Sequence, residues 1–245
     1  MEFIDKNYRF YRDISQLGSF NMLSLAFVEK FSENANLHKH CIPINIKTQE
    51  ILMDDFWKLG DSILNFDKKF LIVNIRLYDP DIKLGHANIL LFEKKDGKIY
   101  AERYDPSYDD SSYRQNILDE TVKKVVELFG AHFRKFNCTV GPQTVSLDIY
   151  GYCQTYTIEY LIKRLNTNMS STDIKREMLR ETLDLDAHYI LLENRIKDIM
   201  LIILSSKYIT NDMAILLLNY NILEPEQKLQ VGEYLQELYR VIVEN

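Results

Sequence analysis

The sequence feature that most constrains the fold is a predicted β-hairpin around Asp96-Gly97. Two β-rich segments, His86–Lys94 and Lys98–Tyr104, flank this dipeptide. An Asp-Gly pair between two apolar segments is the strongest short-range signal for a hairpin turn. Because a hairpin joins neighbouring antiparallel strands, the chain must build at least part of its structure around an antiparallel sheet.

The turn also sets which residues face each other across the hairpin. If the hairpin closes symmetrically on Asp96-Gly97, Asn88 lies opposite Asp105, and His86 lies diagonal to Asp105 on the same face. Diagonal Cβ atoms are about 7–8 Å apart, a gap that longer side chains can span. This register predicts contact between the His86 imidazole and the Asp105 carboxylate, whereas a three-residue loop would place them on opposite faces.

Apolar residues recur at helical spacing before and after the hairpin, and two further segments are β-rich. The expected elements are strands at Phe70–Leu77 and Thr144–Ile149, helices around Leu17–Phe31, Glu50–Leu64, Tyr113–Phe136 and Cys153–Leu165, and further helices from Ser170 to a last one over Glu224–Val243.

These elements predict an α+β fold with a central antiparallel sheet, helical N- and C-terminal segments, and Cys153 at the N-terminus of a helix. We expect a helix-rich N-terminal segment (1–68), a core that carries the chemistry (69–166) and a helical C-terminal extension packed on that core (167–245). With 245 residues, of which 46% are hydrophobic, the chain has ample material for a buried core.

Composition excludes several classes of partner. Thirty Lys and Arg against 36 Asp and Glu give a net charge of −6, which argues against a general nucleic-acid binder. The strongest apolar runs, Ile199–Leu204 and Ala214–Leu218, are far shorter than the about 20 residues of a membrane span. Three cysteines are an odd number for a disulfide scaffold. We therefore expect a cytoplasmic protein that has no membrane-spanning segment and whose main partner is not a nucleic acid.

Four side chains at element boundaries have the chemistry of a thiol hydrolase: His86, Asp105, Gln143 and Cys153. A thiol nucleophile needs an imidazole to manage its proton, an acid to orient the imidazole, and donors for the developing oxyanion. Cys153 begins a predicted helix, where unpaired N–H groups and the helix dipole favour a thiolate. Gly151, just before it, suits a backbone that approaches a substrate closely.

Each of these residues also has an ordinary structural interpretation. A single histidine beside a strand is more often structural, and Asp105 before Pro106 is a common turn residue. Cys153 alone is most often a small buried apolar residue. Gln143 could simply hydrogen-bond a loop.

Taken together, the residues resemble a known family. The order His, Asp, Gln and then Cys at a helix start is similar to the adenain and SUMO-specific protease group of cysteine peptidases. The segments GHANILLF, ERYDP, GPQ and GYCQTYTIEYLIKRL look closest to members encoded by large DNA viruses, over roughly Phe70–Leu165. The resemblance implies the ubiquitin-like protease fold, with His86 as general base, Asp105 as its orienting acid, Cys153 as nucleophile and Gln143 as oxyanion donor.

The same resemblance implies a cysteine-type peptidase without a cofactor or metal. Its protein substrate would be a viral polyprotein or a conjugate of ubiquitin or a ubiquitin-like modifier. We expect Asn88, Gly151 and Tyr152 to bind the substrate, and Gln154 is a second candidate oxyanion donor. The alternatives are an acyltransferase on the same scaffold and a catalytically inactive protein-binding module.

A separate cluster, His38-Lys39-His40-Cys41, brings three potential metal ligands within four residues. A closed zinc site usually takes two ligand pairs, and the sequence offers no matching second pair. We therefore predict a loop at this cluster and no metal site.

Overall fold

The computed structural model describes Ser24, Ala26 and residues 29–45, 47–48, 50–51, 53–78, 85–109, 113–135, 140–145, 152–167 and 169–244. The chain divides into two compact units. One comprises Ser32–His188, and the other combines Met1–Phe31 with Tyr189–Asn245. The predicted helix around Leu17–Phe31 lies largely outside the described residues. The predicted hairpin and all candidate site residues belong to the unit Ser32–His188.

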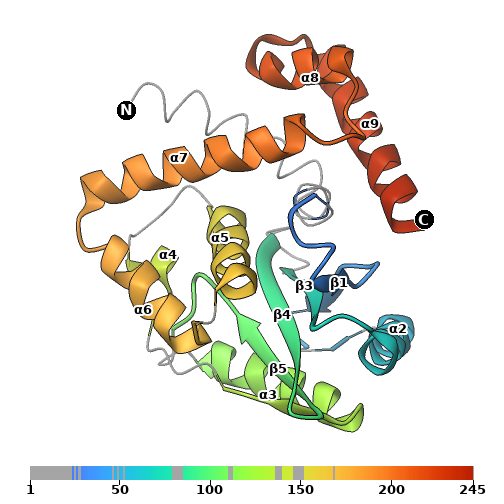
Figure 1. Cartoon of the computed structure of the whole chain (residues 1–245), viewed down its shortest axis with the longest axis vertical. Helices are drawn as coiled ribbons and strands as arrows, with labels where there is room; N and C mark the ends of the chain where they lie inside the picture. The colour runs from blue at the N-terminus through green and yellow to red at the C-terminus, as the bar shows by residue number, and fades with distance from the viewer. Residues whose placement is uncertain are drawn as a thin grey trace. The chain divides into compact units, whose positions relative to one another are not determined.

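The unit Ser32–His188 is an α+β structure built on a six-stranded sheet, which confirms the predicted fold class (Figure 1). Its elements are β1 (Ala35–Leu37), β2 (Ile42–Asn45), α2 (Met53–Asn65), β3 (Phe70–Tyr78), β4 (Gly85–Lys95), β5 (Lys98–Tyr104), α3 (Tyr113–Leu128), β6 (Ala131–Phe133), α4 (Pro142–Val145), α5 (Cys153–Asn166) and α6 (Ser171–Glu181).

The sheet is mixed and not purely antiparallel. Its three long strands, β3, β4 and β5, are antiparallel as predicted, but β6 runs parallel to β5. Short strands β1 and β2 both run parallel to β3 and pair with successive stretches of it, Phe70–Ile72 and Ile75–Tyr78. The edges are parallel because α2 connects β2 to β3 and α3 connects β5 to β6, and a helical crossover joins parallel neighbours.

The β4–β5 hairpin closes on a two-residue turn. Asp96 has φ 52° and Gly97 has φ 72°, and positive φ at both central residues is the mark of a type I′ turn. The register pairs Lys95 with Lys98 and, at the other end, Ile89 with Tyr104. The symmetric closure predicted from Asp96-Gly97 is therefore confirmed.

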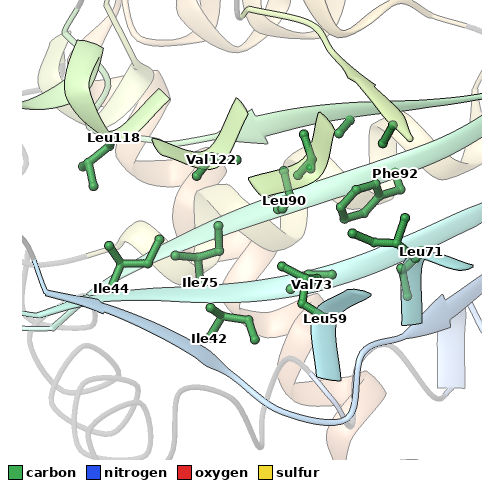
Figure 2. Close-up of a cluster of buried hydrophobic side chains, with 14 of the residues drawn as sticks. Ile42, Ile44, Leu59, Leu71, Val73, Ile75, Leu90, Phe92, Leu118 and Val122 are labelled. Carbon is green, nitrogen blue, oxygen red and sulfur yellow. The ribbon is translucent and has the colours of Figure 1, made fainter. Parts of the chain in front are cut away.

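The main hydrophobic core lies between the sheet and helices α2 and α3 (Figure 2). Alternate residues of β3, such as Val73 and Ile75, meet Leu59 of α2 and Val122 of α3 in this core. Helices α5 and α6 cover the opposite face, where Tyr160 of α5 stacks on a β5 tyrosine. Because both faces of β3 and β4 are covered, these strands read as nearly continuous apolar segments.

Two predicted elements differ from the structure. The helix predicted over Tyr113–Phe136 ends at Leu128, because Gly130 adopts φ 79° and the chain then enters β6. Of the strand predicted at Thr144–Ile149, Thr144 and Val145 lie instead in helix α4, which starts at Pro142, and residues 146–149 lie outside the described residues. Proline suits the first turn of a helix, since its fixed φ is helical and no N–H is needed there.

The part of the second unit that follows His188 is helical, as predicted for the chain after Ser170. Its elements are the larger part of α7 (Leu185–Leu204), then α8 (Asn211–Leu218), η1 (Tyr220–Ile222) and α9 (Pro225–Glu244). Thr210 caps α8 by accepting a hydrogen bond from the Met213 amide. Across the described part of the chain, none of the helices combines the length and the apolar character that crossing a bilayer requires.

Candidate active site

The hairpin register brings the first two predicted site residues together. His86 lies on β4, and Asp105 follows the last residue of β5. The His86 Nε2 atom is 2.6 Å from the Asp105 Oδ1 atom, so the predicted diagonal contact exists. Asp105 is fully buried, whereas the His86 side chain is 28% exposed. The pair therefore has one buried end and one end that solvent or a ligand can reach.

Cys153 is the first residue of α5 and is partly exposed. Its side chain hydrogen-bonds the His86 side chain. Because Asp105 occupies the Nε2 atom of His86, Nδ1 is the ring nitrogen that remains for the thiol. The residue at the helix N-cap, Tyr152, contributes no side-chain capping hydrogen bond, so the first-turn N–H groups of α5 are not capped by its hydroxyl.

The charges of this group are strongly coupled. Burial alone would lower the pKa of His86, but the Asp105 carboxylate outweighs it and, with hydrogen bonds to Asp105 and Cys153, raises the pKa to about 10. Burial would raise the pKa of Asp105, yet His86 and then Arg103 hold that pKa well below its usual range. The site therefore favours an imidazolium–carboxylate pair beside the thiol.

Asp105 is held by hydrogen bonds to both of its oxygens. Oδ1 accepts from His86 and, at 2.9 Å, from the Ser107 amide. Oδ2 accepts from Arg103 at 3.2 Å and from the Gln115 side chain at 2.9 Å. Four donors fix the plane of the carboxylate, so Asp105 can hold the imidazole in one orientation.

Arg103 is the centre of a buried network behind Asp105. Its Nε donates to Asp119 at 2.7 Å, and its two terminal nitrogens donate to Asn88 at 2.5 Å and Gln115 at 2.6 Å. The Arg103 side chain is 1% exposed, and its charge is balanced by the carboxylates of Asp105 and Asp119. A buried guanidinium with this many partners is rigid, and it anchors the acid that contacts His86.

Gln143 lies on α4 and reaches the same turn. The Ser107 hydroxyl donates a 2.8 Å hydrogen bond to the side-chain Oε1 of Gln143, and the backbone N–H of Gln143 donates to Pro106 O at 2.9 Å. Its side chain is therefore held next to the residues that follow Asp105. The role of Gln143 as oxyanion donor stays a prediction.

The other predicted site residues take different positions. Asn88 is fully buried and accepts a hydrogen bond from Arg103, so in this structure it supports the site from behind. Tyr152 is 2% exposed, and Gly151 lies outside the described residues. Gln154 is 8% exposed, and its Oε1 has no hydrogen-bond partner. The substrate roles predicted for Asn88, Gly151 and Tyr152 stay predictions.

The residues that hold Asp105 in place, directly or through one another, were not predicted from the sequence: Arg103, Ser107, Gln115 and Asp119. One signal was present. In the predicted register Arg103 shares a face with Asp105, and that face carries core residues such as Leu90 on the neighbouring strand. An arginine on a core face needs buried partners, and this requirement points to acids on the helix that covers it.

The His38–Cys41 cluster has the loop structure that was predicted. His38 is buried, and its Nδ1 is 2.8 Å from Ser62 Oγ. Burial, with His40 and Lys58 nearby, lowers its pKa to about 4, while burial raises the pKa of the Cys41 thiol to about 12. Within the described ranges, three or more His, Cys, Asp or Glu side chains are nowhere grouped so as to hold a metal ion.

Neither a protein-family model nor a curated protein sequence matches this chain. Several solved structures are similar to it. The central domain of an uncharacterized Legionella pneumophila protein is 15% identical with a TM-score of 0.41, over 69% of this chain and 89% of that one. AvrA with IP6 and CoA is 11% identical with a TM-score of 0.38, over 95% and 88%.

A de-sumoylating protease is 8% identical, with a TM-score of 0.35 over 95% of this chain and 86% of that one. All of these TM-scores lie below 0.5, so the structures do not assign the chain to a family. The function proposed next rests on the geometry of His86, Asp105 and Cys153.

Proposed function

We propose that the chain is a cysteine-type hydrolase that cleaves a peptide or isopeptide bond. Cys153 is the nucleophile, His86 the general acid and base, Asp105 the acid that orients the imidazole, and Gln143 a donor to the oxyanion. The supporting observation is that one imidazole contacts both Asp105, at 2.6 Å, and the thiol of a residue that begins a helix.

The chemistry follows from this arrangement. The Cys153 thiolate attacks the carbonyl carbon, and the carbonyl oxygen becomes an oxyanion. As the C–N bond breaks, the His86 imidazolium gives its proton to the leaving amine, which leaves a thioester on Cys153. A water then gives a proton to His86 and attacks the thioester. The acid product leaves, and the thiolate is regenerated beside the imidazolium.

Asp105 is essential to the first step because it keeps the imidazole charged. Burial disfavours an imidazolium, and the buried carboxylate reverses this preference. The helix dipole of α5 adds a smaller attraction for the thiolate, since a helix N-terminus carries only about half a unit charge. The imidazolium is thus the main stabiliser of the nucleophile.

The test of this proposal has two parts. Iodoacetamide at mildly acidic pH should alkylate Cys153 faster than Cys41, whose pKa is raised to about 12, with each site quantified by mass spectrometry. Cys153→Ala should then reduce turnover of a confirmed substrate by about 10⁴-fold or more, because nucleophile and base act as a unit. Normal turnover by the Cys153→Ala protein would refute the proposal.

The substrate class is tested with ubiquitin and ubiquitin-like proteins that carry a C-terminal electrophile. Covalent labelling at Cys153 would favour removal of a ubiquitin-family modifier, and its absence in a protein that still hydrolyses peptides would favour polyprotein cleavage. Transfer of an acyl group from acyl-CoA would identify the acyltransferase alternative. A thiol no more reactive than Cys41 would identify an inactive binding module.

A further inference from the structure

The turn that follows Asp105 and the segment that carries Gln143 are joined as one piece of structure. The backbone N–H of Gly141 donates to Tyr108 O at 2.7 Å, and the backbone N–H of Gln143 donates to Pro106 O at 2.9 Å. The two segments are more than thirty residues apart in sequence. Backbone hydrogen bonds therefore fix the position of Gln143 relative to Asp105.

Gly141 makes this close approach possible. A Cβ atom at this position would lie 2.2 Å from Pro106 O and 2.8 Å from Tyr108 N, both closer than real Cβ contacts. Both obstructing atoms belong to the backbone, so a side chain would force the two segments apart. A glycine is required here because of packing and not because of its backbone angles.

Ser107 connects the two functional side chains across this junction. Its backbone N–H donates to Asp105 Oδ1 at 2.9 Å, and its hydroxyl donates to Gln143 Oε1 at 2.8 Å. A carboxamide has its oxygen and its NH₂ group on opposite sides. The hydrogen bond to Ser107 holds the Gln143 carboxamide in one orientation, with the oxygen toward Ser107 and the NH₂ group away from it.

We propose that Ser107 is a positioning residue that aims the Gln143 NH₂ group at the oxyanion while its backbone steadies Asp105. This inference rests on the proposed hydrolase function. A rotated Gln143 would present its carbonyl oxygen, which repels an oxyanion. Loss of the Ser107 hydroxyl removes the hydrogen bond that holds the Gln143 oxygen away from this position, so the carboxamide is freer to rotate. Ser107 acts through Gln143, and it does not act through the charge of His86.

This mechanism predicts different effects on two reactions of Cys153. Acylation by p-nitrophenyl acetate forms an oxyanion, whereas alkylation by iodoacetamide displaces iodide and forms none. Ser107→Ala keeps the backbone N–H to Asp105 and removes only the hydroxyl. We expect this variant to acylate about 10-fold more slowly while iodoacetamide reacts at an unchanged rate. The conservative variant Ser107→Thr keeps the hydroxyl and should retain the wild-type acylation rate.

A double-mutant cycle isolates the route of the effect. Gln143→Ala should slow acylation by about 10²-fold, the usual loss for one oxyanion donor. Ser107→Ala should add no further loss in the Gln143→Ala background, because its effect passes through that amide. An equal loss in both backgrounds, or an equal slowing of alkylation, would overturn the inference.

The result separates this inference from the function on which it rests. Cys153→Ala is included as the reference variant, and acylation of that protein at the wild-type rate would refute the hydrolase proposal itself. Loss of acylation in Cys153→Ala together with full activity in Ser107→Ala would refute only the role of Ser107. Thermal unfolding of every variant shows whether each is folded when it is assayed.

Discussion

Strand β5 carries two buried ionic clusters, one on each face of the sheet. Arg103, with Asp105 just beyond the end of the strand, contacts α3, where Gln115 and Asp119 supply partners. On the other face, Glu102 accepts hydrogen bonds from residues of α5. We call the first the site cluster (Asn88, Arg103, Asp105, Gln115, Asp119) and the second the anchor cluster (Glu93, Glu102, Tyr160, Arg164).

The anchor cluster is closed. Arg164 donates to Glu93 at 2.7 Å and to Glu102 at 3.2 Å, and the Tyr160 hydroxyl donates to Glu102 at 2.6 Å. The side chains of Glu93, Glu102 and Arg164 are 12%, 11% and 9% exposed. Its members pair mainly with one another, Ser171 of α6 adds a hydrogen bond to Glu102, and the cluster attaches α5 to the sheet.

The site cluster is equally buried but ends at His86, which is 28% exposed and contacts Cys153. The difference between the two clusters shows that buried charge alone does not mark a candidate active site. What distinguishes the site cluster is an accessible group at its end whose proton can be given away. The two clusters should therefore respond differently to the loss of one charge.

The largest expected effect is on rate, from Asp105→Asn. The neutral side chain no longer offsets the burial of His86, so the imidazole loses its charge and has no proton for the leaving amine. We expect the rate to fall by about 10³- to 10⁴-fold, as when the acid of a hydrolase triad is neutralised. Glu102→Gln in the anchor cluster is the matched control, and a comparable loss of rate there would remove the distinction between the clusters.

The pH profile gives the same prediction a direction. Because the pKa of His86 is raised to about 10, the imidazolium persists at neutral pH, and amide cleavage should decline only as the pH rises through about 10. In Asp105→Asn the burial of His86 is unopposed by a carboxylate, so this alkaline decline should move to lower pH. The rate of amide cleavage, measured across the pH range for the wild type and for Asp105→Asn, gives the alkaline decline of each protein. The same alkaline decline in both proteins would contradict the proposal that Asp105 raises the pKa of His86.

A smaller effect, on stability, is expected from Arg164→Met. This change removes the cation that hydrogen-bonds the buried carboxylates of Glu93 and Glu102, and breaking a buried ion pair typically costs about 3 kcal/mol of unfolding free energy. Urea denaturation measures it. Arg176→Met is the control, because that side chain is 68% exposed and an exposed pair contributes at most about 1 kcal/mol. Equal stability of the two variants would show that the anchor cluster does not stabilise the fold.

The smallest expected effect comes from Gln115→Ala. The hydrogen bond from Gln115 helps to lower the pKa of Asp105, so it stabilises the folded protein where Asp105 is ionised. We expect a loss of about 1 kcal/mol at pH 7. The loss should shrink in acid as the pH falls through the folded-state pKa of Asp105. A deficit that stays constant in acid would mean that Gln115 contributes through its bond to Arg103 or through packing, and not through this carboxylate.

The sequence predicts some of this structure well because the relevant signals are local. The Asp96-Gly97 turn fixes the register of β4 and β5, and that register alone brings His86 to Asp105. The helix start at Cys153 is equally local. The short strands β1 and β2 span three and four residues, too few for a periodic pattern, and their parallel pairing with β3 depends on distant contacts.

The supporting residues of the site were not predicted for a related reason. The hairpin register places Arg103 on a core face, but its partner Gln115 comes from α3, and their hydrogen bond depends on the packing of α3 against β5, which the register does not predict. Ser107 bonds Gln143 across thirty-six positions of sequence, a contact that no local pattern reports. The hairpin register and the helix start at Cys153 identify the reacting groups from the sequence. The residues that hold these groups in place depend on which helix covers each face of the sheet, and local sequence does not show this.

The hairpin turn has a consequence for how this site can change over evolution. His86 and Asp105 stand on the two strands that the turn connects, and their partnership depends on both side chains pointing to one side of the ribbon. A longer turn at Asp96-Gly97 can leave this relation intact, because residues paired across the ladder share a face whatever the loop length. A single residue added within β4 or β5, between the turn and the site, would instead move one of the two side chains to the opposite face. Relatives that keep the partnership should therefore tolerate turns of different length, but should keep the number of strand residues between the turn and each of His86 and Asp105, or absorb an added strand residue in a β-bulge.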